Sequence, residues 1–450
     1  MLIFSCSNNQ SNPVKQPEKK IEIKGPVTFA EHISPIIFKN CTPCHRPGEA
    51  GPFSLLNYSD AKKNANKIKF VTKTGYMPPW PADTAYSHFI NERVLTATEI
   101  ELIQKWVDGK CLPGDTSKVK APGFYNGSFF GKPDLVIPFE KAIPIKGNGT
   151  DIFYMIKASY ELKKDTFVRF YEFVPQQRKL VHHVNGHLIG FEKDKKKNVF
   201  GGISYCVDDP KLPNDMYKKM GLANDDGTFP PMLPGTVYYL PGFQPLIFPE
   251  GIGGFYMAKK GAILLKNLHY GPSKSDCKDS SVINVFFGPR PKRPIKESQL
   301  GTFGVAPIEP AFNIPANTVK TFSSKWKVPR DISIMSVNPH MHLLGTKFWA
   351  YALTPTGDTI KLVRINKWNF NWQYYYSYKH PVKIPAGSLL CAFGTYDNTV
   401  KNPFNPFTPP RDCKERNDLF SMGTTEEMFQ FIFTWLPYQP GDENMDLEGK

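Results

Sequence analysis

The sequence of 450 residues predicts a multidomain protein in which a small all-α domain is followed by two all-β sandwich domains, jelly-roll-like in character. Two patterns predict this. Apolar residues follow helical spacing in roughly the first 115 residues, whereas short runs rich in β-branched and aromatic residues fill the rest. A stretch rich in Pro, Gly and Ser separates the two patterns and is typical of a linker.

These patterns divide the chain into five parts. A helical domain of about ninety residues leaves most of the chain unexplained, so further domains are required. The predicted parts are an N-terminal tether, the helical domain, the linker and two β domains: 1–24, 25–115, 116–132, 133–298 and 299–443.

Two amphipathic segments predict the helical domain. Over 29–40 the apolar positions recur at helical spacing: Phe29, Ile33, Ile36 and Ile37. The segment 98–110 collects its apolar residues on one side and ends at Gly109, a residue type that commonly terminates helices.

Ten short runs predict the two β domains, because each is bounded by turn residues. Five runs precede a basic, Pro-rich stretch at 288–294: FYMIKASY, TFVRFYEFV, VHHVNGHLIGF, AILLKNLHYG and VINVFFG. Five runs follow it: TVKTFSSKWKV, ISIMSVNPHMHL, KFWAYALTP, SLLCAFGTYDN and EMFQFIFTWL. The similar length of the two series favours two sandwiches of similar size.

The most informative motif is Cys41-Thr42-Pro43-Cys44-His45, because C-x-x-C-H is the attachment site of a c-type haem. Cys41 and Cys44 would hold the haem covalently, and His45 would be an axial ligand of its iron. A redox pair or a zinc pair is the alternative interpretation of the two cysteines. Because a helix runs into the motif and another follows, the region resembles a small cytochrome c.

Met77 is the predicted second axial ligand of the iron. It lies in the Pro-rich stretch 76–80, between the two predicted helices. A thioether ligand raises the potential of the iron and suits electron transfer. The alternatives are that Met77 fills the core beside Trp80, or that His88 is the ligand.

The first residues predict an exported lipoprotein. Residues 2–6, which end at Cys6, resemble a bacterial lipobox, and the polar stretch 7–24 is typical of a tether. The basic and apolar parts of a signal peptide are mostly missing, and an ordinary cysteine is the alternative. Since covalent haem attachment also indicates export, we expect the periplasm or outer membrane, with membrane attachment through Cys6.

The charge of the chain does not indicate a nucleic-acid partner. The net charge is +15, but the lysines are scattered and no nucleic-acid motif accompanies them, so no nucleic-acid partner is expected. The densest basic run, 193–197, is typical of a solvated hairpin turn.

Five cysteines lie outside the lipobox-like segment and the C-x-x-C-H motif: Cys111, Cys206, Cys277, Cys391 and Cys413. They can form at most two disulfides, and the sequence does not show which cysteines pair.

Five of the ten histidines cluster in the β region, and imidazole is a common ligand for copper and zinc. His340 and His342 are two residues apart, so on a strand both rings point to one face and can reach one ion. His182 and His183 are adjacent and reach one ion only at a twist or bulge. His269 lies in Leu268-His-Tyr270. The alternative to a metal ligand there is a histidine of the core that is hydrogen-bonded to a carbonyl oxygen.

These motifs resemble the copper type II, ascorbate-dependent monooxygenases, the family of the peptidylglycine α-hydroxylating and dopamine β-monooxygenases. His-His, Leu-His-Tyr, Pro-His-Met-His-Leu-x-Gly and Thr424–Met428 occur in the family's order, over about 130–443. The resemblance implies two coppers, with these ligands: His182, His183 and His269 for one, and His340, His342 and Met428 for the other. His187 is a rival in the first set and Met422 in the second.

The chain departs from the family pattern at three positions, and two of them bear on the substrate. Where the peptide-hydroxylating enzyme has an Arg that grips the substrate carboxylate, this chain has Asn338, and where it has a contributing Tyr, this chain has Ile432. Both differences argue against a peptide ending in glycine. Phe429 replaces a disulfide-bonded cysteine of the animal enzymes, so that bridge is not expected for Cys391.

The resemblance, together with the haem motif, implies a haem- and copper-dependent monooxygenase. It would hydroxylate a C–H bond of a small molecule or peptide with O2, and a separate electron donor would reduce the haem. Stretches 44–50, 77–80 and 396–398 resemble the cytochrome-fused bacterial members. The alternative is a non-enzymatic, periplasmic copper-binding electron-transfer protein. A di-haem peroxidase would need a second C-x-x-C-H, and a zinc hydrolase is disfavoured because H-E-x-x-H does not occur.

Overall fold

A computed structural model describes residues 25–124, 128–208, 215–242, 247–415 and 426–448. Within these ranges the chain is mostly β-sheet with few helices, as expected for β-sandwich domains. It forms two compact units. Unit 1 comprises 1–42, 55–78 and 94–121, and unit 2 comprises 43–54, 79–93 and 122–450, of which only the described residues are discussed.

The helices of unit 1 lie close to their predicted positions. The segment predicted as a helix over 29–40 starts as a π-helical turn, η1 (Phe29–Ile33), and continues as α1 (Ser34–Asn40). Two helices that we did not predict follow, α2 (Tyr58–Lys63) and α3 (Ala65–Lys73). The last helix, α4 (Ala97–Asp108), corresponds to the helix predicted over 98–110. Helix α4 begins at a reciprocal cap between Thr96 and Glu99 and ends at Gly109. Its Ile103 and Trp106 are buried.

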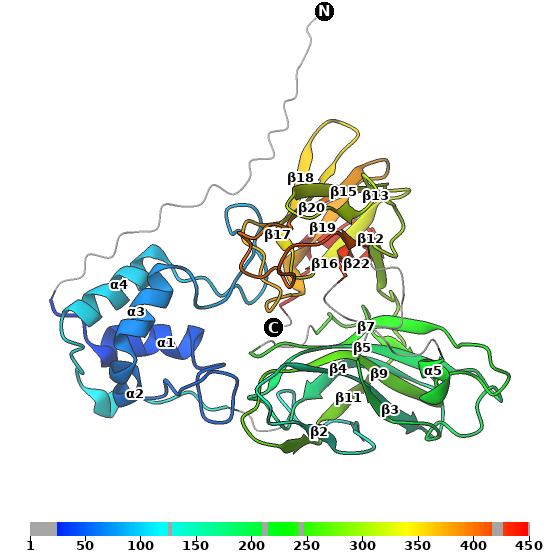
Figure 1. The fold of residues 1–450 in the computed structure, drawn as a ribbon, viewed down its shortest axis with the longest axis horizontal. Helices are drawn as coiled ribbons and strands as arrows, with labels where there is room; N and C mark the ends of the chain where they lie inside the picture. The colour runs from blue at the N-terminus through cyan, green and yellow to red at the C-terminus, as the bar shows by residue number, and fades with distance from the viewer. Residues whose placement is uncertain (1–24, 125–127, 209–214, 243–246, 416–425, 449–450) are drawn as a thin grey trace, which may run out of the picture. The chain divides into compact units, whose positions relative to one another are not determined.

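The first β-sandwich consists of two antiparallel sheets and a short two-stranded ladder (Figure 1). The five-stranded sheet has the order β6 (Tyr205–Val207), β3 (Ile152–Glu161), β9 (Lys260–Tyr270), β5 (Val181–Phe191) and β7 (Met232–Tyr239). The four-stranded sheet has the order β1 (Leu135–Pro138), β11 (Val282–Gly288), β4 (Thr166–Val174) and β8 (Phe255–Met257). The ladder pairs β10 (Cys277–Asp279) with β2 (Ile143–Ile145). Apolar side chains of both sheets form one core.

The second β-sandwich has the same number of strands in its sheets. The five-stranded sheet has the order β13 (Ile308–Glu309), β15 (Val319–Lys327), β20 (Leu389–Asp397), β17 (Gly345–Leu353) and β18 (Thr359–Ile365). The four-stranded sheet has the order β12 (Lys296–Gly301), β22 (Phe429–Pro437), β16 (Ile332–Met341) and β19 (Tyr376–Ile384). A ladder pairs β14 (Asn313–Ile314) with β21 (Cys413–Lys414). All residues of β16 are buried.

Three short helices complete the described elements: η2 (Thr116–Lys118), α5 (Met216–Lys219) and η3 (Asp442–Asn444). None of the helices in the described ranges is long and apolar enough to cross a membrane. The described cysteines form no disulfide with one another.

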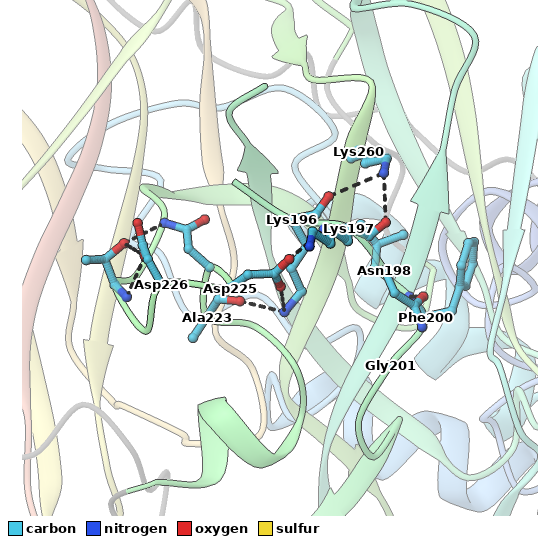
Figure 2. Close-up of polar contacts among 12 residues, drawn as sticks. Lys196, Lys197, Asn198, Phe200, Gly201, Ala223, Asp225, Asp226 and Lys260 are labelled. Atoms are coloured by element: carbon cyan, nitrogen blue, oxygen red, sulfur yellow. Dashed lines mark hydrogen bonds and ion pairs between the residues drawn. The ribbon is translucent and has the colours of Figure 1, made fainter. Parts of the chain in front are cut away.

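The lysine run after β5 is a partly exposed turn that is tied to neighbouring loops (Figure 2). Lys196 donates to the Ala223 carbonyl oxygen at 2.6 Å, and the Lys197 backbone N–H donates to Asp225 at 2.9 Å. Lys260, at the start of β9, donates to the Lys197 carbonyl at 2.8 Å. The basic charge of this turn is therefore partly used inside the first sandwich.

Candidate functional site

Two strands of the first sandwich bring three histidines together. His182 and His183 lie on β5, and His269 lies on the adjacent strand β9, opposite His183. The register shifts on both sides of His183, so β5 does not alternate regularly there. Both adjacent imidazoles approach His269, with ring centroids 4.7 Å away for His182 and 5.0 Å away for His183. This is the irregularity that two adjacent histidines need in order to share one ion.

Asp151, which the sequence analysis did not single out, joins this cluster. It directly precedes β3, and its Oδ1 lies 2.7 Å from Nε2 of His269. One ligand atom each from Asp151, His182 and His269 lies within 4.8 Å of the others. The Phe153 ring stacks on His269 at 4.2 Å. With Nε2 turned to the carboxylate, His269 would offer Nδ1 to a metal.

The electrostatics of the cluster favour neutral imidazoles, the form that binds metals. Burial, with His269 nearby, lowers the pKa of His182 to about 4, and burial lowers the pKa of His183 well below its ordinary value. The buried Nε2 of His183 has no hydrogen-bond partner among the described residues. A ring nitrogen without a partner fits a ligand atom. The residues present therefore fit a copper ion.

His187, the rival ligand, lies elsewhere. It stands opposite Leu264 on β9, and the charged group that acts on it is Lys266. Burial and Lys266 together lower the pKa of His187 to about 3. Nδ1 of His187 is also buried without a hydrogen-bond partner among the described residues, but only the rings of His182 and His183 approach that of His269 there, so we prefer these two as the ligands on β5.

The second sandwich brings His340 and His342 together as their spacing predicts. His340 lies on β16 and His342 directly after it, both are buried, and their ring centroids are 5.0 Å apart. Nδ1 of His340 contacts Oε1 of Gln373, and Nδ1 of His342 lies 2.5 Å from the Glu426 carbonyl oxygen. With both Nδ1 atoms engaged, Nε2 is the atom that each ring would offer to a metal.

Glu427 fixes the backbone that carries His342. Its Oε2 accepts the His342 N–H at 2.9 Å, and its Oε1 accepts the Leu344 N–H at 2.6 Å. The side chain is buried, with 1% of the residue exposed. Two N–H groups on one carboxylate hold the turn after β16 in one conformation, which orients the ring of His342.

Met428 directly precedes β22, whose first residue, Phe429, pairs with Met341 of β16. Met428 is therefore next to the strand pair that carries the two histidines. It is buried, and its carbonyl oxygen accepts the Tyr396 hydroxyl at 2.6 Å. The competing Met422 lies outside the described residues, as does Cys6 of the lipobox-like segment.

Phe370, in the loop between β18 and β19, contacts one histidine of each set. Its ring centroid lies 6.3 Å from that of His183 and 5.8 Å from that of His342. Both sandwiches belong to the same compact unit. An apolar ring therefore lies beside both candidate metal sites.

The two substituted family positions are paired across strands. Asn338 on β16 stands opposite Ile432 on β22. Asn338 is buried and donates from Nδ2 to the Tyr374 carbonyl oxygen at 2.8 Å. Its amide is thus engaged by the backbone, and neither residue presents a cation to a carboxylate.

The residues predicted to bind haem are divided between the two units. Cys41 follows α1 in unit 1, and Met77 also belongs to unit 1, where its N–H donates to the Val71 carbonyl oxygen at 3.1 Å. Cys44 and His45 belong to unit 2. His45 places Nδ1 3.2 Å from the Phe53 carbonyl oxygen, which leaves Nε2 for an iron. The rival His88 has a side chain that is 67% exposed and pairs with Glu92.

The loop around His45 fits an axial ligand. A Cβ atom at Gly51 would lie 2.9 Å from Cγ of His45, so only glycine allows this approach. Burial lowers the pKa of His45, which favours the neutral ring that iron binds. Cys41 and Cys44 are not joined in a disulfide.

Two segments next to the haem motif residues are anchored inside unit 2. Glu49 pairs with Arg178 at 3.2 Å, in the turn before β5. After Met77, the Pro79 carbonyl oxygen accepts the Tyr374 hydroxyl at 2.9 Å, and the Trp80 ring lies 5.4 Å from the Tyr374 ring. Tyr374 is the neighbour of Gln373, the partner of His340.

Comparison with known proteins agrees with the second site. Residues 309–405, which include His340 and His342, match the family model for the copper type II ascorbate-dependent monooxygenase, C-terminal domain. No curated protein matches the chain.

Two solved structures of infectious bursal disease virus are among the structural matches. The VP2 subviral particle is 8% identical, with 70% of this chain and 75% of that chain covered and a TM-score of 0.18. The Gx strain structure is 9% identical, with 71% and 85% covered and a TM-score of 0.14. TM-scores this low carry no argument about fold or function.

Proposed function

We propose that this protein is a copper-dependent monooxygenase that receives its electrons through an attached c-type haem. The observation that carries the copper assignment is the buried pair His340 and His342, inside the range that matches the copper monooxygenase family. The reaction would use O2, two electrons and two protons to convert a C–H bond to C–OH, with water as the second product.

The two histidine clusters and the family resemblance together support the following copper ligands. His182, His183 and His269 would hold one copper, and His340, His342 and Met428 the other. Copper, when bound, supplies the one-electron and oxygen chemistry. A thioether such as that of Met428 favours Cu(I), whereas three imidazoles suit either oxidation state.

The protein's own groups orient the imidazoles and limit the access of water. Asp151, Gln373 and the Glu426 carbonyl each engage one ring nitrogen, which fixes the tautomer of His269, His340 and His342. Phe370 lies against both sets and provides an apolar wall.

The haem relay is supported by the anchoring of the two haem-flanking segments in unit 2. The Trp80 and Tyr374 rings are in contact. Gln373, the residue directly before Tyr374, contacts His340. This connected path would carry electrons from the haem towards the second histidine set. Cys41 and Cys44 would attach the haem, and His45 and Met77 would be its axial ligands.

Metal analysis of periplasmically expressed protein tests the proposal directly. We expect about one haem iron and about two coppers per chain. Product-linked oxygen consumption that disappears in His342→Ala would support the oxygenase. Zinc in place of copper, or no copper, would overturn the assignment. Both metals without any hydroxylated product, over a panel of C–H substrates, would leave the alternative of a copper-binding electron-transfer protein.

The expected class of substrate rests on two residues of the sequence. Because Asn338 and Ile432 offer no cation, we expect a small molecule or a peptide without a recognised C-terminal glycine.

We also propose an exported lipoprotein, anchored through Cys6 in the periplasm or at the outer membrane. Cys6→Ser should move the protein from the membrane fraction to the soluble periplasmic fraction, and unchanged fractionation would contradict the anchor.

A further inference from the structure

A cavity of about 300 Å³ in unit 2 lies apart from both histidine sets. Strands β4, β7 and β12 contribute to its lining, and no histidine lines it. Seven of its seventeen lining residues are Phe or Tyr, among them Tyr171, Tyr238 and Tyr375. Glu297 is the one charged residue among them. A volume of this size is at the lower end of the range for small-molecule sites.

Glu297 lies on β12, opposite Thr434 of β22, and its carboxylate has no hydrogen-bond or ion-pair partner in the part of the chain that the structure describes. The neighbouring Lys296 forms no ion pair with it, and its ammonium instead lies 5.3 Å from the Trp435 ring centroid. Burial raises the pKa of Glu297 to about 7. An acidic group in such surroundings gains free energy from a cation that enters beside it.

The carboxylate is held close to the cavity wall. Gly235 of β7 has a φ of +65°, and a Cβ atom there would lie 2.4 Å from Oε2 of Glu297. Two hydroxyl groups of the lining have partners within the protein, whereas the buried Tyr171 hydroxyl has none among the described residues. The Ser336 hydroxyl donates to Thr434 at 2.9 Å, and the Thr236 hydroxyl donates to the Gly186 carbonyl at 3.1 Å. Glu297 is therefore the charged group of the lining that is left to bind a polar ligand.

We propose that this cavity binds a small organic cation, from a primary to a quaternary alkylammonium, with the charge against Glu297 and the alkyl groups against the aromatic rings. Phe and Tyr faces attract such cations, most strongly where water is excluded. The Tyr238 and Tyr375 rings, 4.5 Å apart and nearly perpendicular, offer one face and one edge. A metal ion fits less well, because a single carboxylate does not supply the several oxygen ligands that hard cations need.

The test is isothermal titration of the full chain with methylammonium, tetramethylammonium and choline. The control ligand is 3,3-dimethyl-1-butanol, which has the shape of choline without its charge. We expect at least one of the three cations to bind, and at least about tenfold more tightly than the neutral alcohol.

Two variants connect binding to the cavity. Glu297→Gln keeps the size of the side chain and should weaken binding of the cation by about tenfold or more. Glu309→Gln removes an exposed carboxylate of the same sandwich and should leave binding unchanged. In the ligand-free protein, Glu297→Gln should keep or raise the melting temperature, because it removes an unpaired acid from partly desolvated surroundings.

Three results would overturn the proposal. They are no binding of any of the three cations, equal binding of choline and its neutral isostere, and unchanged affinity in a folded Glu297→Gln protein. A lower melting temperature in ligand-free Glu297→Gln would also contradict it, because that would show that the carboxylate already has a partner within the protein. None of these measurements depends on copper or haem.

Discussion

The two histidine sets are oriented by different means. In the first sandwich, an irregular stretch of β5 turns two adjacent rings towards His269, and the side chain of Asp151, 50% exposed, holds that ring from outside. In the second sandwich, regular spacing by two places the rings, and the buried Glu427 holds the backbone at His342 and Leu344. A buried clamp has no water to replace it, so the second set should tolerate change less well than the first.

The largest effect should come from removing a ligand. Changing the outer partner of a metal ligand typically costs about 10- to 100-fold in affinity or activity, so loss of the ligand itself should cost more. His342→Ala should therefore reduce bound copper from about two to about one per chain and lower product formation by more than about 100-fold. Copper counting and oxygen-uptake assays measure the two effects.

The control for this variant is His380→Ala, since His380 is exposed and its ring contacts only the Met445 carbonyl oxygen among the described groups. It should bind the same amount of copper as the wild type. Equal copper in His342→Ala and His380→Ala would remove His342 from the ligand set.

The second-largest effect should come from changing Glu427, whose carboxylate holds the backbone at His342 and Leu344. Glu427→Gln keeps the shape, but its amide nitrogen cannot accept an N–H, so one of the donors on His342 or Leu344 loses its partner. We expect a loss of about 1–3 kcal/mol in the free energy of unfolding. Copper affinity of the second set should fall by about tenfold or more while that of the first stays the same.

Denaturant unfolding and copper titration of the two sites distinguish this clamp from a general packing role. A side chain with a general packing role only would lower the free energy of unfolding without a selective loss of copper at the second set. If Glu427→Gln weakened copper binding equally at both sets, the idea of a local backbone clamp would be wrong.

A smaller effect is expected at the exposed carboxylate. The hydrogen bond with His269 is the main reason that the pKa of Asp151 lies below its ordinary value, although its side chain is half exposed. Asp151→Asn should therefore lower copper affinity of the first set by no more than about tenfold, with the second set unchanged. Glu192→Gln, at an exposed position of the same sandwich, is the matched control. A complete loss of the first copper would instead make Asp151 a direct ligand.

The smallest effect should come from the contact that anchors the segment after Met77. Tyr374→Phe keeps the ring beside Trp80 but removes the hydrogen bond to the Pro79 carbonyl oxygen. The free energy of unfolding should fall by about 0.5–1.5 kcal/mol, measured by denaturant titration, with both copper sites still loaded. Loss of copper from the second set would mean that Tyr374 orients Gln373 more strictly than the contacts indicate.

The local pattern was sufficient to predict most strands and the histidine pairs. The runs at 166–174, 181–191 and 282–288 were predicted with the bounds that the structure has for β4, β5 and β11. Alternation and turn residues determine such elements locally. The same alternation implied that His182 and His183 can reach one ion only at an irregularity, and β5 has register shifts at this point.

The partners of the histidines could not be predicted in this way. Asp151 meets His269 across 118 positions, and the loop residue Gln373 meets His340 across 33. Such contacts depend on which strands pair and on loop conformation, and neither leaves a periodic signal in the sequence. Glu427 directly precedes Met428, the predicted ligand. Its role in accepting backbone N–H groups is evident only in the structure, where its carboxylate lies beside the turn after β16.

The irregular register of β5 has a consequence for anyone who wishes to transplant the first histidine set into another β-sandwich. Copying His182, His183 and His269 onto two regular strands would send one of the adjacent rings to the far face of the sheet. The portable unit is the three histidines together with the two register shifts around His183. A design that omits the shifts would retain at most two of the three imidazoles on one face of the sheet.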